Sequence, residues 1–238
     1  MPDRRSHRGP HPEDLQLFDP ACWPLLQQAV HDICWLLTRG YPDGAATKLV
    51  GDRYSLSARQ RVAVQRCSCS DSQRADRQSR QVQPDLLRGR AVWLDGYNVL
   101  TTIEAALAGA VILPGHDGCY RDMASMHGSY RKVEETAPAL ELLGQYLAQC
   151  ATGPCTWYFD QPVSNSGRLK TILQHIAAEH AWPWQAQLVP NPDPLLAASS
   201  EIIVTADSAV LDAGPVWFNL AREVVQHSVP EANVVRLA

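Results

Sequence analysis

Hydrophobic positions divide the chain into a helical part and a part in which strands and helices alternate. Between Asp19 and Gly40 they recur at three- and four-residue intervals, and Asp19 has the place of a helix cap. Two shorter helices are indicated by DGAATKLVG and SARQRVAVQRC, the second of which opens with a capping-box pattern at Ser57. We therefore predict a small all-α helical domain over residues 13–67, after a disordered leader at residues 1–12.

Residues 68–90 are mostly Ser, Gln, Arg and Asp, which predicts a basic polar linker or helix between two units. From residue 91 onward, short β-branched or aromatic runs alternate with amphipathic helical stretches, as in a parallel sheet covered by helices. The second unit, residues 91–238, is therefore predicted to be an α/β domain with an open parallel sheet. Its strands are expected at 91–95, 155–160, 185–189, 201–206, 216–220 and 233–237.

The net charge of −4 conceals an asymmetry between the two parts. Residues 1–90 carry 14 Lys and Arg against 10 Asp and Glu, whereas residues 91–238 carry 7 against 15. A basic arm beside an acidic body suits a protein that grips a polyanion with one part and coordinates cations with the other. The alternative is that the arginine-rich stretch is only a solvated helix face.

The apolar runs are far shorter than the roughly 20 residues that span a bilayer, and the N-terminal MPDRRSHRGPHPEDL has no apolar signal core. The seven cysteines form no CxxC pair and mostly lie in apolar runs, as reduced thiols do. We therefore expect a cytoplasmic protein that does not bind membranes. Homo-oligomerisation and a protein partner stay open.

Three predicted strands end in, or run into, an aspartate: Asp95 follows VWL, Asp160 follows TWYF, and Asp207 follows IIVTA, with Asp212 on the next turn. The carboxyl ends of parallel strands line one crevice, so these side chains are expected to converge. Carboxylates held close together repel one another unless a hard cation neutralises them, and Mg²⁺ and Mn²⁺ favour such oxygen ligands. We predict that Asp95, Asp160 and Asp207 hold Mg²⁺ or Mn²⁺. A helix cap or a turn is the alternative for each single aspartate.

Polar residues beside these aspartates are candidate ligands for metal or substrate. Asn98 can ligate a metal or hold a carboxylate in place, and Thr205 and Ser208 supply hydroxyls on either side of Asp207. The segment PVSNSGRLK opens a helix whose N–H groups and two cations can hold a phosphate, with plain capping as the alternative. Its candidate phosphate ligands are Ser164, Asn165, Ser166, Arg168 and Lys170.

The order of a hydrophobic strand, DGYN, a later strand ending in Asp, and TADS at another strand end resembles the PIN-like nuclease superfamily, particularly its NYN branch. Members of that branch are magnesium- or manganese-dependent ribonucleases with a Rossmann-like sheet. The resemblance implies that Asp95 is the metal ligand after the first strand, with Asn98 as its companion. It implies that Asp160 is the mid-sheet acid and Asp207 the late acid.

Many PIN-like enzymes also use a helical glutamate, which the resemblance assigns to Glu135 or to its neighbour Glu134 in KVEET. Asn219 stands where some relatives place another acid, so the chain departs from the pattern there. Longer blocks of the chain, among them WLLTRGYPDGAATKLVGDRYSLSARQR, DGYNVLTTIEAALAG, YRKVEETAPALELL, PVSNSGRL and LVPNPD, resemble an uncharacterised prokaryotic family catalogued as domain of unknown function 434.

These features favour a metal-dependent endoribonuclease that hydrolyses RNA phosphodiesters, with Asp212 or Glu135 completing the set of catalytic acids. A PIN-like module that binds RNA or protein without cutting is the first alternative, and Asn219 favours it. A phosphatase or nucleotide-processing hydrolase is the second alternative. The haloacid-dehalogenase type of phosphatase would place an aspartate at position 97, where this chain has Tyr97.

Overall fold

Four of the predicted strands form a parallel sheet in the order β5-β4-β1-β6. The computed structural model describes residues 7–124 and 130–238 and places Val92 of β1 opposite both Cys155 of β4 and Ile202 of β6. All carboxyl ends lie at one edge, because the strands are parallel. The strands are β1 (Val92–Asp95), β4 (Cys155–Asp160), β5 (Trp184–Val189) and β6 (Ile202–Val204). The predicted α/β class with a parallel sheet is therefore confirmed.

Successive strand side chains enter two apolar cores on opposite faces of the sheet. Leu94 and Trp157 belong to the larger core, which α6, α7, α8 and α11 cover, whereas Tyr158 and Ile203 belong to a smaller core beneath α9 and α10. This alternation explains why the strands read as continuous apolar runs. The helices are α6 (Gly96–Leu107), α7 (Thr136–Gln149), α8 (Ser166–Glu179), α9 (Asp193–Ala197), α10 (Ser208–Asp212) and α11 (Leu220–Ser228).

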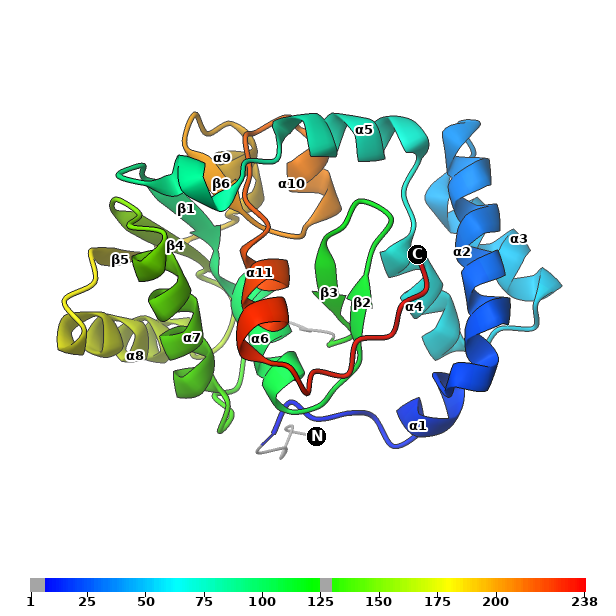
Figure 1. Cartoon of the computed structure of the whole chain (residues 1–238), viewed down its shortest axis with the longest axis horizontal. Coiled ribbons are helices and arrows are strands. Elements are labelled where there is room, and N and C mark those ends of the chain that lie inside the picture. Colours follow the sequence, from blue (N-terminus) through cyan, green and yellow to red (C-terminus); the bar gives the residue numbers. More distant parts are fainter. Residues whose placement is uncertain (1–6, 125–129) are drawn as a thin grey trace.

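The predicted helical region lies beside the sheet part (Figure 1). Asp19 caps a short 3-10 turn before the long helix, and Ser57 and Gln60 form the complete capping box that the sequence predicts. The apolar core of these helices continues into Leu113 and Leu237, so the helical unit packs onto the rest of the chain. Its helices are α1 (Asp14–Leu17), α2 (Trp23–Thr38), α3 (Asp43–Arg53) and α4 (Ala58–Cys67).

The stretch from residue 68 to residue 90 contains α5 (Asp71–Arg80) and a 3-10 turn at Pro84–Leu87. Helix α5 runs from the helical unit toward α10, above the hairpin in Figure 1. Arg77 of α5 is 1% exposed, so this polar segment packs against the rest of the protein as well as connecting its two parts.

An antiparallel hairpin of β2 (Ile112–Pro114) and β3 (Tyr120–Asp122) stands between the helical unit and the sheet, in a segment for which the sequence predicted no strand. The strands expected at 216–220 and 233–237 are wrong: Trp217 and Val234 make only isolated bridges. The apolar run VWFNL resembles a strand, but Pro215 precedes it and α11 already begins at Leu220. Too few residues remain extended to form a ladder.

Residues 7–12, which we expected to be disordered, make defined contacts in the structure. The Arg8 guanidinium forms an ion pair with the fully buried Glu104 at 2.5 Å, and His7 contacts Glu135 at 2.8 Å. Residues 1–6 of the expected leader lie outside the described residues. No helix within the described ranges is long and apolar enough to cross a membrane.

Candidate functional site

The carboxylate of Asp95 is buried at the end of the central strand β1, with 7% of the residue exposed. Burial raises its pKa to about 7, the hydrogen bond from Thr205 opposes this shift, and the charges of Asp207 and Asp193 add to it. A buried carboxyl that titrates near neutrality beside two other carboxylates is an unusual group for a merely structural position.

Thr205 connects the ends of the neighbouring strands β1 and β6. Its hydroxyl donates to Asp95 Oδ2 at 2.8 Å and accepts the Asp207 N–H at 3.0 Å. Asn98, in the first turn of α6, accepts the Ala206 N–H through Oδ1 at 2.8 Å. The sequence-predicted residues Asp95, Asn98 and Thr205 therefore meet, and their mutual hydrogen bonds fix the two strand ends relative to one another.

Asp207 caps α10 as the alternative interpretation expected. Its Oδ1 accepts the N–H groups of Ala209 at 2.8 Å and Val210 at 3.1 Å. Its Oδ2 has no hydrogen-bond partner within residues 7–124 and 130–238, and Asp207 still raises the pKa of Asp95. One oxygen thus stabilises the helix while the other stays available to a ligand.

Asp193, which the sequence interpretation did not single out, joins this group at the start of α9. Partial burial of its carboxyl raises its pKa, and the charges of Asp207 and Asp160 raise it further. The signal in the sequence is weaker than for Asp95 and Asp160, because Pro190, Asn191 and Pro192 stand between the end of β5 and Asp193. Its strand, QAQLV, simply does not end in the aspartate.

Asp160 is half-buried at the end of β4, and burial raises its pKa. Its charge raises the pKa of Asp193. Among the residues that the structure describes, no three His, Cys, Asp or Glu side chains are arranged to hold a metal ion by themselves. The strand-end carboxylates therefore share one electrostatic environment without forming a closed set of protein ligands.

Two of the predicted catalytic acids, Asp212 and Glu135, make contacts away from the strand-end aspartates. Asp212 accepts hydrogen bonds from Arg77 Nε and Gln73 Nε2, both at 2.8 Å, so its charge is already neutralised. Glu135 immediately precedes α7 and contacts His7, while its neighbour Glu134 is also close to His7. Neither acid is among the main causes of the pKa shift of Asp95.

The predicted phosphate-binding segment lies at the start of α8. Asn165 has a left-handed conformation with φ 69° and no side-chain cap bond, because its Nδ2 donates to the Tyr130 carbonyl at 2.8 Å. The Tyr130 N–H in turn donates to Ser164 O, and the buried Ser166 hydroxyl donates to Gln161 O. Arg168 and Lys170 form no ion pair with described residues. The phosphate role of this segment stays a prediction.

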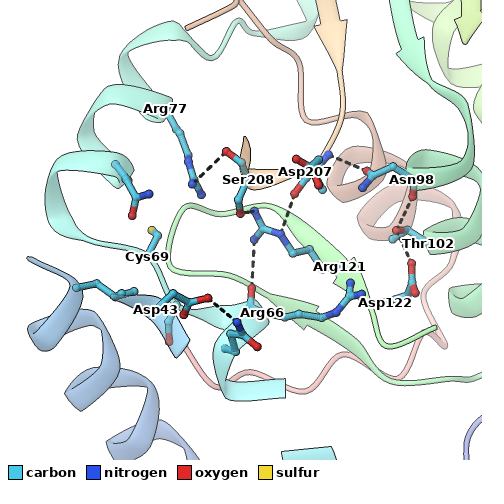
Figure 2. A pocket seen from close by; sticks show the side chains of 15 residues that line it. Asp43, Arg66, Cys69, Arg77, Asn98, Thr102, Arg121, Asp122, Asp207 and Ser208 are labelled. Atoms are coloured by element: carbon cyan, nitrogen blue, oxygen red, sulfur yellow. Dashed lines mark hydrogen bonds between the residues drawn. The ribbon is translucent and has the colours of Figure 1, made fainter. Parts of the chain in front are cut away.

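A polar cavity of about 480 Å³ opens between the helical unit and the strand ends (Figure 2). One wall carries Asp43, Gln65 and Arg66 from α3 and α4. The other wall includes Asn98, Asp122, Asp207 and Ser208, which places part of the aspartate group directly on the cavity. A concave polar site next to carboxyls with raised pKa values is the most site-like feature of the described residues.

A buried ion network supports the same edge of the cavity. Asp117 lies between two arginines, 2.5 Å from Arg77 Nη1 and 2.7 Å from Arg121 Nη2. Burial alone would raise the pKa of Asp117, but the two guanidinium groups outweigh it and hold the pKa well below its usual range. Arg121 Nε also donates to the Ala206 carbonyl at 2.9 Å, so the network positions the segment that carries Asp207.

Asn219, the position at which the resemblance to PIN-like nucleases suggests another acid, has a structural contact here. It is 3% exposed, and its Nδ2 donates to the Gly118 carbonyl at 2.9 Å. This bond needs the amide of asparagine, because a carboxylate cannot donate to a carbonyl. The departure from the PIN-like pattern thus coincides with a contact that ties α11 to the hairpin.

Fold and site define an α/β protein with a parallel sheet, an attached helical unit and a polar cavity at the junction of the two. The chain belongs to the family described as "Domain of unknown function (DUF5616)", whose model matches residues 84–223. Residues 25–80 match the model described as "Protein of unknown function (DUF434)", which confirms the resemblance to that family for the first of the sequence blocks, whereas the later blocks lie within the DUF5616 match. The boundary between the two matches falls in the segment between α5 and β1.

The chain is also 26% identical over 204 residues to an uncharacterized protein of Methanocaldococcus jannaschii. The match covers 85% of this chain and 97% of that protein, so the helical unit and the sheet part occur together in both. No solved structure matches the chain.

Proposed function

We propose that the protein is a divalent-metal-dependent ribonuclease whose catalytic centre is the group of strand-end aspartates. The single observation that supports this most is the raised pKa of Asp95, to which burial and the charges of Asp207 and Asp193 contribute. Such mutual repulsion is costly in a folded protein, and a cation relieves it.

The donor set fits Mg²⁺ or Mn²⁺. Mg²⁺ usually keeps several waters and is held by one or two carboxylates together with substrate phosphates, so a closed set of three protein ligands is not required. Asp95 and the free Oδ2 of Asp207 would hold the ion, with Asp193 and Asp160 at its periphery. When bound, the ion would neutralise charge on the phosphate and activate water for hydrolysis.

The surrounding residues orient these acids. Thr205 fixes the Asp95 carboxylate through its 2.8 Å hydrogen bond, and Asn98 holds the backbone of the segment that carries Asp207. Asp193 and Asp160 have raised pKa values and partly exposed surroundings, which suit carboxyls that exchange protons with water and with the leaving oxygen. The polar cavity, which Asp207 and Asn98 line, offers space for part of the RNA strand.

Cleavage of labelled single-stranded RNA in the presence of Mn²⁺ tests this proposal. Wild type and Asp212→Asn should cleave, because Asp212 is already paired with Arg77. Asp95→Asn and Asp207→Asn should lose activity by at least ~100-fold, as expected when a group that holds the charged transition state is removed. Equal residual cleavage by all four proteins would indicate a contaminating nuclease and overturn the proposal.

A second candidate, an RNA-binding module without hydrolysis, is favoured by one observation. Asp207 commits one carboxylate oxygen to capping α10, and Asp212 and Glu135 are engaged elsewhere. RNA binding by wild type without any cleavage in Mn²⁺ or Mg²⁺ would select this candidate.

A further inference from the structure

The cavity has one wall from each part of the chain. Gln65 and Arg66 belong to α4, whereas Asn98 and Asp207 lie where α6 and α10 begin, at the carboxyl edge of the sheet. Figure 2 shows the side chain of Arg66 on one side of this space and those of Asn98 and Asp207 on the other. A ligand in this cavity would contact the helical unit and the aspartate group together.

Arg66 differs from the other two arginines that line the cavity. Arg77 and Arg121 are buried and paired with Asp117, and Arg77 is also paired with Asp212. The Arg66 side chain has neither a hydrogen bond nor an ion pair with any residue in the described ranges, although its carbonyl accepts from Arg121. It is half-buried and points toward the side of the cavity that holds Asp122 in Figure 2.

Two acids that line the cavity, Asp122 and Asp43, accept hydrogen bonds from neighbouring residues, unlike the Arg66 side chain. Asp122 accepts hydrogen bonds from Thr102 at 3.0 Å and from the Ala124 N–H at 2.6 Å, and Asp43 accepts from Gln65. Asn98 accepts the Ala206 N–H through Oδ1, so its Nδ2 is a donor without a partner among the described residues. Two donor groups on the lining of the cavity are therefore unused within the described ranges, the Arg66 guanidinium and the Asn98 amide N–H, and both kinds of group bind phosphate oxygens.

We infer that this cavity binds a phosphate group of the RNA strand, with Arg66 as the principal cation and the Asn98 amide as a second donor, so that the helical unit forms one wall of the substrate site. The inference rests on the proposed function, since it names how the same site holds its substrate. The volume of about 480 Å³ lies within the roughly 300–1,000 Å³ of pockets for small ligands, which suits one nucleotide unit of a single strand and not a duplex.

Binding without cleavage tests the inference. Fluorescence anisotropy with a labelled single-stranded RNA of about 10 nucleotides is recorded in EDTA, over a series of salt concentrations. The variants are Arg66→Gln, Arg66→Lys and the matched control Arg74→Gln, whose residue is exposed on α5 and does not line the cavity. Melting curves confirm that each variant is folded.

Arg66→Gln should weaken binding about 10-fold and reduce the slope of log K against log salt by about 1, whereas Arg66→Lys should retain most affinity. Arg74→Gln should change affinity less than about 2-fold, because that residue contributes only long-range charge. Equal weakening by Arg66→Gln and Arg74→Gln would mean nonspecific attraction and overturn the inference. Displacement of the labelled RNA by adenosine monophosphate from wild type but not from Arg66→Gln would support a phosphate subsite. Inorganic phosphate is tested in the same way, and equal displacement by it would identify a site for a bare anion.

The cleavage assay separates this inference from the proposed function. RNA binding that depends on Arg66, without cleavage in Mn²⁺, would keep the subsite and reject the nuclease. Cleavage with an unchanged KM in Arg66→Gln would keep the nuclease and reject the subsite. Absence of both binding and cleavage in wild type would reject both.

Discussion

The Thr205 hydroxyl donates a hydrogen bond of 2.8 Å to the Asp95 carboxylate, joining the ends of two neighbouring parallel strands across 110 positions of sequence. The same hydroxyl accepts the backbone N–H of Asp207. One threonine therefore sets the position of one acid and the backbone of another. It also favours the charged form of Asp95 against the effect of burial.

Replacing Thr205 with valine should raise the pKa of Asp95 above its value of about 7, because the hydrogen bond that favours the carboxylate is lost. The Asp207 N–H also loses its acceptor, so we expect a loss of about 1–3 kcal/mol in the free energy of unfolding. The pH profile of RNA cleavage should shift to higher pH. Thr205→Ser keeps the hydroxyl and serves as the control; a shift of equal size in the serine variant would contradict this role.

Asp95→Asn should change the pH dependence of stability. The pKa of Asp95 is raised from 3.8 to about 7, so between these values the folded state binds more protons than the unfolded state, and stability falls as pH rises. Asparagine does not titrate, so the free energy of unfolding of the variant relative to wild type should increase by on the order of 3 kcal/mol across this interval. Urea denaturation at several pH values measures this difference. A difference that does not vary with pH would show that Asp95 has an ordinary pKa.

Asp117→Asn should be strongly destabilising, by about 3–5 kcal/mol at neutral pH, because it leaves the buried Arg77 and Arg121 without their shared counter-charge. The pKa of Asp117 is held well below its usual range, so this stabilisation is present above the unfolded pKa of 3.8 and is lost as pH falls below it. Asp212→Asn is the matched control, since the Asp212 side chain is 34% exposed and should cost less. If chemical denaturation shows the same loss in the free energy of unfolding for both variants, the role of Asp117 as the shared counter-charge of the two arginines is contradicted.

Asn219→Asp introduces the acid that the resemblance to PIN-like nucleases suggests at this position, yet it should not increase cleavage. The buried Nδ2 of Asn219 donates to Gly118 O, and a carboxylate at that position would face a carbonyl without a proton to donate. We expect a loss of about 1–3 kcal/mol in the free energy of unfolding. Higher activity in Asn219→Asp, with unchanged thermal stability, would show that the position belongs to the catalytic centre.

The parallel sheet and the positions of two strand-end acids could be predicted from the sequence, because they depend on local patterns. Apolar runs that end in aspartate mark Asp95 and Asp160, and the capping box at Ser57 depends on residues three positions apart. The hairpin at 112–122 was missed, because each of its strands is only three residues long. The strand expected at 216–220 is wrong although its composition is typical of a strand. Pro215 precedes the segment and α11 begins at Leu220, so the extended part is too short.

The partners of individual charges could not be predicted, because they depend on how distant segments pack. Asp212 was expected beside Asp207 from its spacing, but Arg77, 135 positions earlier, takes its carboxylate. Asp193 was overlooked because three residues separate it from its strand, although it lies close enough to Asp95 to raise the pKa of that carboxyl. Arg66 belongs to a helix with an ordinary amphipathic pattern, and only the packing of α4 against the hairpin places it on the cavity.

Calorimetric titration of Mn²⁺ into the protein, at a pH above the Asp95 pKa of about 7, tests most directly whether the strand-end aspartates hold a cation. We predict saturable binding to wild type and to Asp212→Asn, loss of that binding in Asp95→Asn and Asp207→Asn, and weaker binding as pH falls below 7. Binding that is equal in all four proteins, or absent in wild type, would contradict the account.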